Sequence, residues 1–160
     1  MEKELTALVV GLGNREVTPD ALGPDVVSNL RITRHVIQEY GVQSMGREYA
    51  NSISGLVPGV MAQTGMETLE IIKGVVDETK PDVVFAVDAL AARSTKRLNR
   101  TIQITDTGIN PGSGVGNHRN GLSEETLGVK VIGIGVPTVV DAATIVQDSM
   151  AHLLDTLERV

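Results

Sequence analysis

Apolar positions in this chain come in short runs separated by polar loops. The runs fall at residues 5–10, 53–57, 83–87 and 129–136. Mostly apolar runs of this length, rich in Val, Ile and Leu, are typical of strands buried on both faces of a sheet. Residues 101–105 instead alternate apolar and polar side chains. This alternation favours a half-exposed strand and fits an antiparallel strand near an edge.

Helical spacing of apolar residues follows the first, second and last of these runs. After the first run, Pro24 suits a first helical position, and Val26, Val27 and Leu30 continue an apolar face. The four residues 64–67 match a capping box before an apolar stripe over 69–76. Residues 138–141 carry a second such signature before a last helix that runs toward Glu158.

The alternation of strands and helices predicts the fold class. We expect an α/β domain with a mostly parallel sheet flanked by helices, formed as one domain over residues 1–160. The loop 107–121 is rich in Gly, Asn and Pro and is longer than usual connections in compact domains. Its length favours a flap or substrate-binding loop, while the alternative is a structural connection that needs glycine for positive φ.

The amino-acid composition excludes several classes of protein and argues against some partners. The chain has 160 residues and no Cys, which excludes a disulfide framework, a thiol protease and a Cys-built zinc site. A formal net charge of -6 and only three aromatic residues argue against a nucleic-acid partner. No signal peptide or membrane-spanning run is visible, so we expect a soluble cytoplasmic protein without a membrane partner.

Several common catalytic and cofactor motifs are missing. There is no GxSxG nucleophile elbow and no phosphate-binding P-loop, and the third glycine of a dinucleotide fingerprint is replaced by Glu16. His35, His118 and His152 share no metal-binding spacing. We therefore expect no metal and no cofactor.

Two aspartates remain as candidates at the carboxyl ends of strands, where ligands bind in open α/β sheets. Asp20 lies in the loop after the first strand, and Asp88 closes the apolar run 83–87. Both could simply cap backbone amides, Asp20 at the helix near Pro24 and Asp88 at a turn. Held close together, they could instead share a proton and activate water for hydrolysis. Arg93 could orient a carboxylate, or form only a surface ion pair.

The order of several motifs resembles the germination protease family, the spore endopeptidases of peptidase family A25. The resemblance covers about residues 8–145. It is carried by Gly11-Leu12-Gly13-Asn14, Val17-Thr18-Pro19-Asp20-Ala21-Leu22-Gly23-Pro24, Pro58-Gly59-Val60-Met61, Gln63-Thr64-Gly65-Met66-Glu67-Thr68, Asp88-Ala89-Leu90-Ala91-Ala92-Arg93-Ser94, Asp106-Thr107-Gly108-Ile109, Pro111-Gly112-Ser113-Gly114-Val115-Gly116-Asn117 and Pro137-Thr138-Val139-Val140-Asp141-Ala142. Several signatures in one order are far more specific than any single motif.

The resemblance implies an α/β/α sandwich similar to the hydrogenase-maturation endopeptidases. It implies an atypical aspartic-type endopeptidase that degrades small acid-soluble spore proteins in the spore core during germination, cutting next to a glutamate. The family's two catalytic aspartates match Asp20 and Asp88. Supporting or substrate-binding roles are expected for Asn14, Arg93, Gly112, Ser113 and Gly114. Family members are zymogens that assemble as tetramers, so a homo-oligomer is an expectation too.

The sequence departs from the family in length. Germination proteases carry an N-terminal pro-segment and a C-terminal extension, whereas here the first strand begins almost at Met1. A trimmed core or a minimal relative is therefore expected. Two alternatives to an active endopeptidase stay open: a non-catalytic core that binds a partner, and a peptidyl-tRNA hydrolase-like esterase, suggested by Gly11–Asn14 and Thr33-Arg34-His35 but opposed by the acidic charge.

Overall fold

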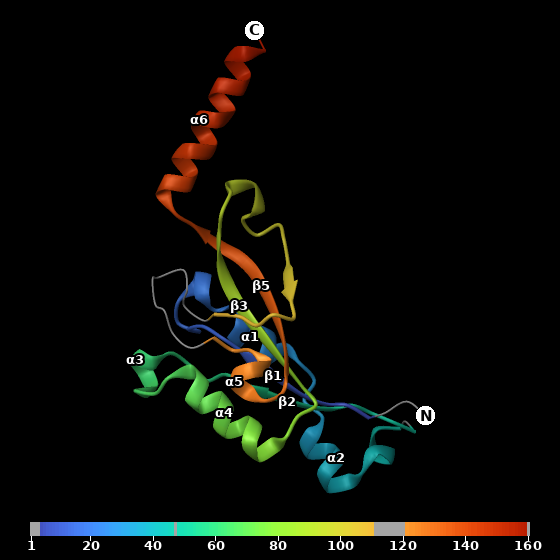
Figure 1. The fold of residues 1–160 in the computed structure, drawn as a ribbon. Coiled ribbons are helices and arrows are strands. Elements are labelled where there is room, and N and C mark those ends of the chain that lie inside the picture. The colour runs from blue at the N-terminus through green and yellow to red at the C-terminus, as the bar shows by residue number, and fades with distance from the viewer. Residues whose placement is uncertain (1–3, 47, 111–120, 160) are drawn as a thin grey trace.

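The computed structural model describes residues 4–46, 48–110 and 121–159. Its elements in chain order are β1 (Thr6–Gly11), η1 (Thr18–Asp20), α1 (Leu22–Asn29), α2 (Arg34–Tyr40), η2 (Val42–Met45), β2 (Ser52–Leu56), α3 (Met61–Thr64), α4 (Thr68–Thr79), β3 (Val83–Ala92), η3 (Thr95–Arg97), β4 (Gln103–Thr105), α5 (Glu124–Leu127), β5 (Lys130–Val140) and α6 (Ala142–Glu158). Figure 1 shows their arrangement.

Within the described residues, five strands form one sheet in the order β2-β1-β3-β5-β4. The pairs β1–β2, β1–β3 and β3–β5 are parallel, and β4 pairs with β5 in the antiparallel direction. This confirms both the mostly parallel sheet and the antiparallel strand at its edge. The parallel connections require the crossovers that the strand-helix alternation predicted.

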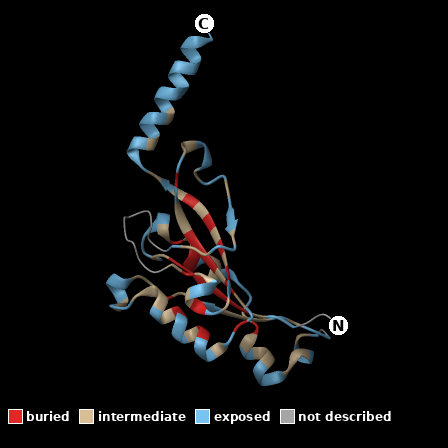
Figure 2. Cartoon of the chain, in the orientation of Figure 1, coloured by how far each residue is buried: buried red, intermediate tan, exposed pale blue. Residues whose placement is uncertain are grey.

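Helices cover both faces of the sheet. Ile72 and Val76 of α4 and Leu127 of α5 pack against alternate residues of the strands. Those alternate residues are Leu8, Val10, Val84, Ala86 and Val131, which share one face because side chains in a strand point to opposite sides in turn. On the other face, α1 approaches the sheet closely where Gly11 and Gly23 meet. The α/β sandwich is therefore present, and Figure 2 shows the buried residues gathered in the sheet between these helices.

Two predicted helix starts are wrong. Helix α1 begins at Leu22, so Pro24 occupies its third position, where the missing N–H costs nothing because the first turn has no intrahelical partners. Helix α4 begins after Glu67, which forms a capping box with Glu70. Thr64 instead ends the short helix α3.

The last strand and helix also differ from the capping-box prediction. Strand β5 continues to Val140, so Thr138 is part of the strand and does not cap a helix. Asp141 alone caps α6, and its carboxylate accepts the Thr144 N–H at 2.8 Å. Helix α6 then extends away from the sheet and is exposed along its length (Figures 1 and 2).

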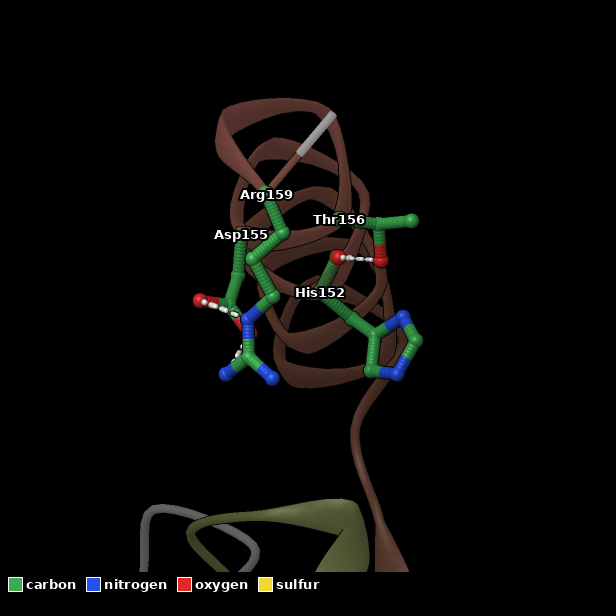
Figure 3. Close-up of polar contacts among 4 residues, drawn as sticks. All are labelled: His152, Asp155, Thr156 and Arg159. Atoms are coloured by element: carbon green, nitrogen blue, oxygen red, sulfur yellow. Dashed lines mark hydrogen bonds and ion pairs between the residues drawn. The ribbon is translucent and has the colours of Figure 1, made fainter.

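The polar side of the distal half of α6 is held by contacts within the helix. Figure 3 shows the Arg159 guanidinium paired with Asp155 at 2.9 Å and the Thr156 hydroxyl donating to the His152 carbonyl at 2.8 Å. Five apolar side chains of the helix are 56–63% exposed, and Ile145 is 45% exposed; the five are Val146, Met150, Leu153, Leu154 and Leu157. Among the described residues no helix combines the length and hydrophobicity needed to cross a bilayer.

Candidate active site

Asp20 sits at the end of a surface turn that follows β1. Its carboxylate accepts the backbone N–H of Asn14 at 2.8 Å, and its own N–H donates to the Val17 carbonyl at 2.7 Å. The prediction that Asp20 caps the following helix is wrong, because the N-cap of α1 is Ala21, without a side-chain cap. The carboxylate is thus turned back toward the end of β1, where the predicted site lies.

Gly13 makes this tight turn possible. Its φ is +107°, and a Cβ at this position would lie 2.1 Å from the Asp20 carbonyl oxygen and 3.0 Å from Asp20 Oδ1. A side chain would therefore collide with backbone that cannot move out of the way without shifting Asp20. Gly13 was not among the predicted site residues, although its place two residues after Gly11 marks the turn.

Asp88 lies inside β3, where its side chain is only 6% exposed. The strand continues to Ala92, so Asp88 does not close a strand or cap a turn as the simpler interpretation held. Its Oδ1 accepts the N–H of the next residue, Ala89, at 2.9 Å. In β3–β5 pairing it stands opposite Gly135, which brings no side chain of its own to this position.

Burial raises the pKa of Asp88 to about 7. The hydrogen bond from Ala89 acts in the opposite direction, and the charge of Asp20 raises the pKa further. Desolvation disfavours the charged carboxylate, and a neighbouring negative charge adds to that effect. The two predicted aspartates thus lie within electrostatic reach of each other, and both forms of the Asp88 carboxyl are populated near neutral pH.

Asn14 supports this arrangement at the Asp20 side. Besides its backbone bond to Asp20, its side-chain oxygen accepts the Glu16 N–H at 3.0 Å and the Gln63 amide of α3 at 3.3 Å. Gln63 was missed as a contributor to the site. The only hint in the sequence was its place in a motif shared with the family, since its distance from Asn14 along the chain gives no signal.

Of the remaining predicted residues, only Arg93 lies in the described part of the chain, and it makes no polar contact with the aspartates. Arg93 is exposed just after β3, and within the described part of the chain no hydrogen bond or ion pair joins it to Asp20 or Asp88. Gly112, Ser113 and Gly114 lie outside the described residues. The two described ends of their loop are joined by Ile109 and Leu122, whose backbones exchange hydrogen bonds of 2.9 and 2.8 Å.

The histidines and the Thr-Arg-His motif lie elsewhere. His35 on α2 and His152 on α6 are exposed, and His118 is outside the described residues. Thr33 is buried, donates to the Asn51 carbonyl at 2.7 Å and accepts the Ile53 N–H at 2.9 Å, so it links α2 to β2. In residues 4–46, 48–110 and 121–159 no three His, Cys, Asp or Glu side chains are grouped as metal ligands.

Comparison with known proteins points to one family. The family model for germination protease matches residues 1–160. A germination protease from Bacillus subtilis (strain 168) is 57% identical over 156 residues, which are 96% of this chain and 41% of that protein. A germination protease from Caldanaerobacter subterraneus subsp. tengcongensis is 57% identical over 157 residues, 98% of this chain and 48% of that protein. The chain therefore spans less than half the length of these relatives.

One solved structure is also similar, a NiFe hydrogenase maturation protease from Thermococcus kodakarensis KOD1. It is 18% identical, with a TM-score of 0.46, and the match covers 99% of this chain and 96% of that protein.

Proposed function

The chain belongs to the germination protease family, and from this premise we propose that residues 1–160 form one α/β protease domain that uses Asp20 and Asp88 to hydrolyse peptide bonds. The family supports a peptidase of spore germination. The assignment of an aspartic-type mechanism to these two residues is our proposal.

The observation that carries the mechanism is the contrast between the two carboxyl groups. Asp88 is buried and its pKa is raised to about 7, so its protonated form is populated at neutral pH. Asp20 is partly exposed, and its carboxylate accepts a backbone N–H. Neighbouring carboxyl groups in different environments are the usual arrangement for one acid and one base.

The proposed step needs only these two groups and one water. The Asp20 carboxylate takes a proton from water while the water oxygen bonds to the scissile carbonyl carbon, and the Asp88 carboxyl gives its proton to the carbonyl oxygen. When the tetrahedral intermediate collapses, the carbon–nitrogen bond breaks and the leaving nitrogen takes the proton held by Asp20. Asp88 recovers its proton from the hydroxyl, so both carboxyl groups return to their starting states.

The resemblance to the family supports a substrate class. We propose that the substrates are small acid-soluble spore proteins, cut beside a glutamate of a short acidic motif in the spore core, and that the protein acts as a homo-oligomer. The acidic charge of this chain accords with a substrate freed from DNA, because a net charge of -6 disfavours approach to a nucleic acid.

A cleavage assay on a DNA-free small acid-soluble spore protein tests the proposal. The variants are Asp20→Asn and Asp88→Asn, which keep the side-chain shape but remove the carboxyl chemistry. Asp77→Asn is the matched control, because Asp77 is an exposed aspartate of α4 that only pairs with Lys73 at 3.8 Å. Each protein is assayed with and without a chelator.

We expect both site variants to lose at least about 100-fold in kcat, the scale of a lost acid or base, while Asp77→Asn and the chelator leave the rate unchanged. Cleavage that persists in Asp20→Asn or Asp88→Asn contradicts the assignment of the pair. If the folded wild-type chain does not cleave but binds the spore protein, the non-catalytic alternative replaces the endopeptidase.

A further inference from the structure

We propose that Thr138 is a positioning residue for Asp20: its hydroxyl ties the Asp20 turn to strand β5 and thereby sets where the Asp20 carboxylate stands relative to Asp88. This inference rests on the proposed function of the aspartate pair and adds a residue to it. The contact joins positions that are 119 residues apart in sequence.

The turn that carries Asp20 has little packing of its own. Residues 15–19 are exposed, and the three-residue helix η1 buries no residue. Hydrogen bonds within the turn, such as Val17 N–H to the Asn14 carbonyl at 3.1 Å, shape it, and the Arg15 side chain donates to the Pro24 carbonyl of α1 at 3.3 Å, but none of these bonds reaches the sheet. A turn with few buried contacts is free to shift unless another element holds it.

Thr138 supplies such a hold. Its hydroxyl donates to the Pro19 carbonyl at 2.5 Å from within β5. Thr138 stands at a register shift of this strand, between Pro137 and Val139, which pair with Leu90 and Ala91 of β3. A β-branched side chain on a strand has a restricted χ1, so the hydroxyl direction is well defined. The donor is therefore held between two residues that pair with β3, the strand that carries Asp88.

The accepting atom is placed to control Asp20 directly. The Pro19 carbonyl oxygen and the N and Cα atoms of Asp20 belong to one planar peptide unit. Proline also fixes its own φ, which removes one way for the carbonyl to swing. Holding the Pro19 oxygen consequently fixes the backbone of Asp20, and the Asn14 N–H then holds its carboxylate.

Loss of the Thr138–Pro19 hydrogen bond should change the pKa of Asp88, because the charge of Asp20 contributes to the raised pKa of Asp88. If the turn moves away when the tie is lost, that contribution falls and Asp88 titrates at a lower pH. Burial remains the larger cause, so the titration midpoint should fall only part of the way.

The test compares Thr138→Val, which removes the hydroxyl but keeps a β-branched strand residue, with Thr138→Ser, which keeps the hydroxyl. Thr101→Val is the matched control, since Thr101 donates to the Arg97 carbonyl at 3.3 Å in the connection between η3 and β4. Two readouts are used on the whole chain: kcat and KM for a DNA-free small acid-soluble spore protein, and titration of the Asp88 carboxyl carbon by NMR, assigned with Asp88→Asn.

For Thr138→Val we expect kcat to fall by about 10- to 100-fold with KM changed less than about twofold, since a displacement of roughly 1 Å can cost that much. The Asp88 midpoint should move below the wild-type value. Thr138→Ser and Thr101→Val should match the wild type in both readouts. A Thr138→Val protein with unchanged kcat and unchanged midpoint overturns the inference.

The two readouts separate this inference from the proposed function. If the wild-type chain does not cleave, the proposed function fails, but the Asp88 midpoint still reports whether Thr138 sets the position of Asp20. If cleavage and its loss in the aspartate variants are observed while the midpoint of Thr138→Val stays at the wild-type value, the aspartate pair stands and the role of Thr138 is refuted.

Discussion

The site edge of the sheet and helix α6 use the same residue type in opposite ways. Asp88 is buried in β3 with one hydrogen bond from Ala89, and its pKa is raised. Asp148 of α6 accepts the Thr95 hydroxyl and N–H, both at 2.7 Å, and the Ser94 hydroxyl at 3.0 Å, and these bonds lower its pKa. Burial and the number of hydrogen-bond donors, and not the residue type, therefore decide whether an aspartate is protonated or charged near neutral pH.

Apolar residues also differ between the two regions. Ile72 is fully buried in the core between α4 and the sheet, whereas five apolar side chains of α6, from Val146 to Leu157, are each more than half exposed. Equal hydrophobicity therefore contributes unequally to stability, because only area removed from water counts. Variants in the two regions, and their pH dependence, should therefore differ in unfolding free energy.

The largest expected effect is on the core. Ile72→Ala should lower the free energy of unfolding by about 2–5 kcal/mol, since it removes buried methylene groups and leaves a cavity. Leu153→Ala is the matched variant on α6 and should change the free energy of unfolding by less than about 0.5 kcal/mol. Urea unfolding of both gives the two values. If Leu153→Ala lowered the free energy of unfolding as much as Ile72→Ala, the apolar side of α6 would be buried against another surface in solution.

The next effect is the pH dependence of stability caused by Asp88. Its folded-state pKa of about 7 lies above the ordinary aspartate value of 3.8, so the folded protein binds the proton more tightly than the unfolded chain. Stability should therefore fall as the pH rises from about 4 to about 7, by at most about 4 kcal/mol at roughly 1.4 kcal/mol per tenfold change in proton affinity.

Urea unfolding across this pH range checks the expectation, with Asp88→Asn as the comparison. The asparagine variant should lack the decline, because it has no proton to lose. An identical pH profile in the two proteins would show that Asp88 titrates normally and would weaken its role as the acid.

The smallest expected effect is the pH dependence of stability caused by Asp148, which has the opposite sign to that of Asp88. Its lowered folded-state pKa means that its contribution is present above the unfolded value and is lost as the pH falls through the folded value. Asp148→Asn should therefore lower the free energy of unfolding slightly near pH 7, and this difference from the wild type should disappear in acid. Faster hydrogen exchange in α6 would report the loosened contact with Ser94 and Thr95. Unchanged exchange in α6 would contradict this role for Asp148.

Local pattern accounts for most of the fold. The short apolar runs correctly indicated β1, β2, β3 and β5, and the alternation at 101–105 correctly indicated the edge strand β4. Helix starts were less predictable, because Thr64 and Thr138 match a capping box by spacing alone. Whether a threonine caps a helix depends on where the neighbouring chain turns, which a four-residue motif does not record.

Some residues of the candidate site could likewise be predicted from the sequence, and others could not. Asp20 and Asp88 could be proposed because they follow or interrupt apolar runs and match the family's motifs. The contacts of Gln63 with Asn14 and of Thr138 with Pro19 could not, because they join residues 49 and 119 positions apart. Such contacts depend on the crossovers that bring α3 and β5 beside the first turn.

The sequence by itself determined the order of the main strands and helices and the family, and it singled out the two aspartates as candidates, since these depend on residue type, spacing and order along the chain. Only the tertiary structure decided that Asp88 is buried within β3, that the charge of Asp20 reaches it, and that α6 leaves its apolar side in water. The physical reason is that desolvation and electrostatic interaction depend on distances through space, which the packing of distant segments sets.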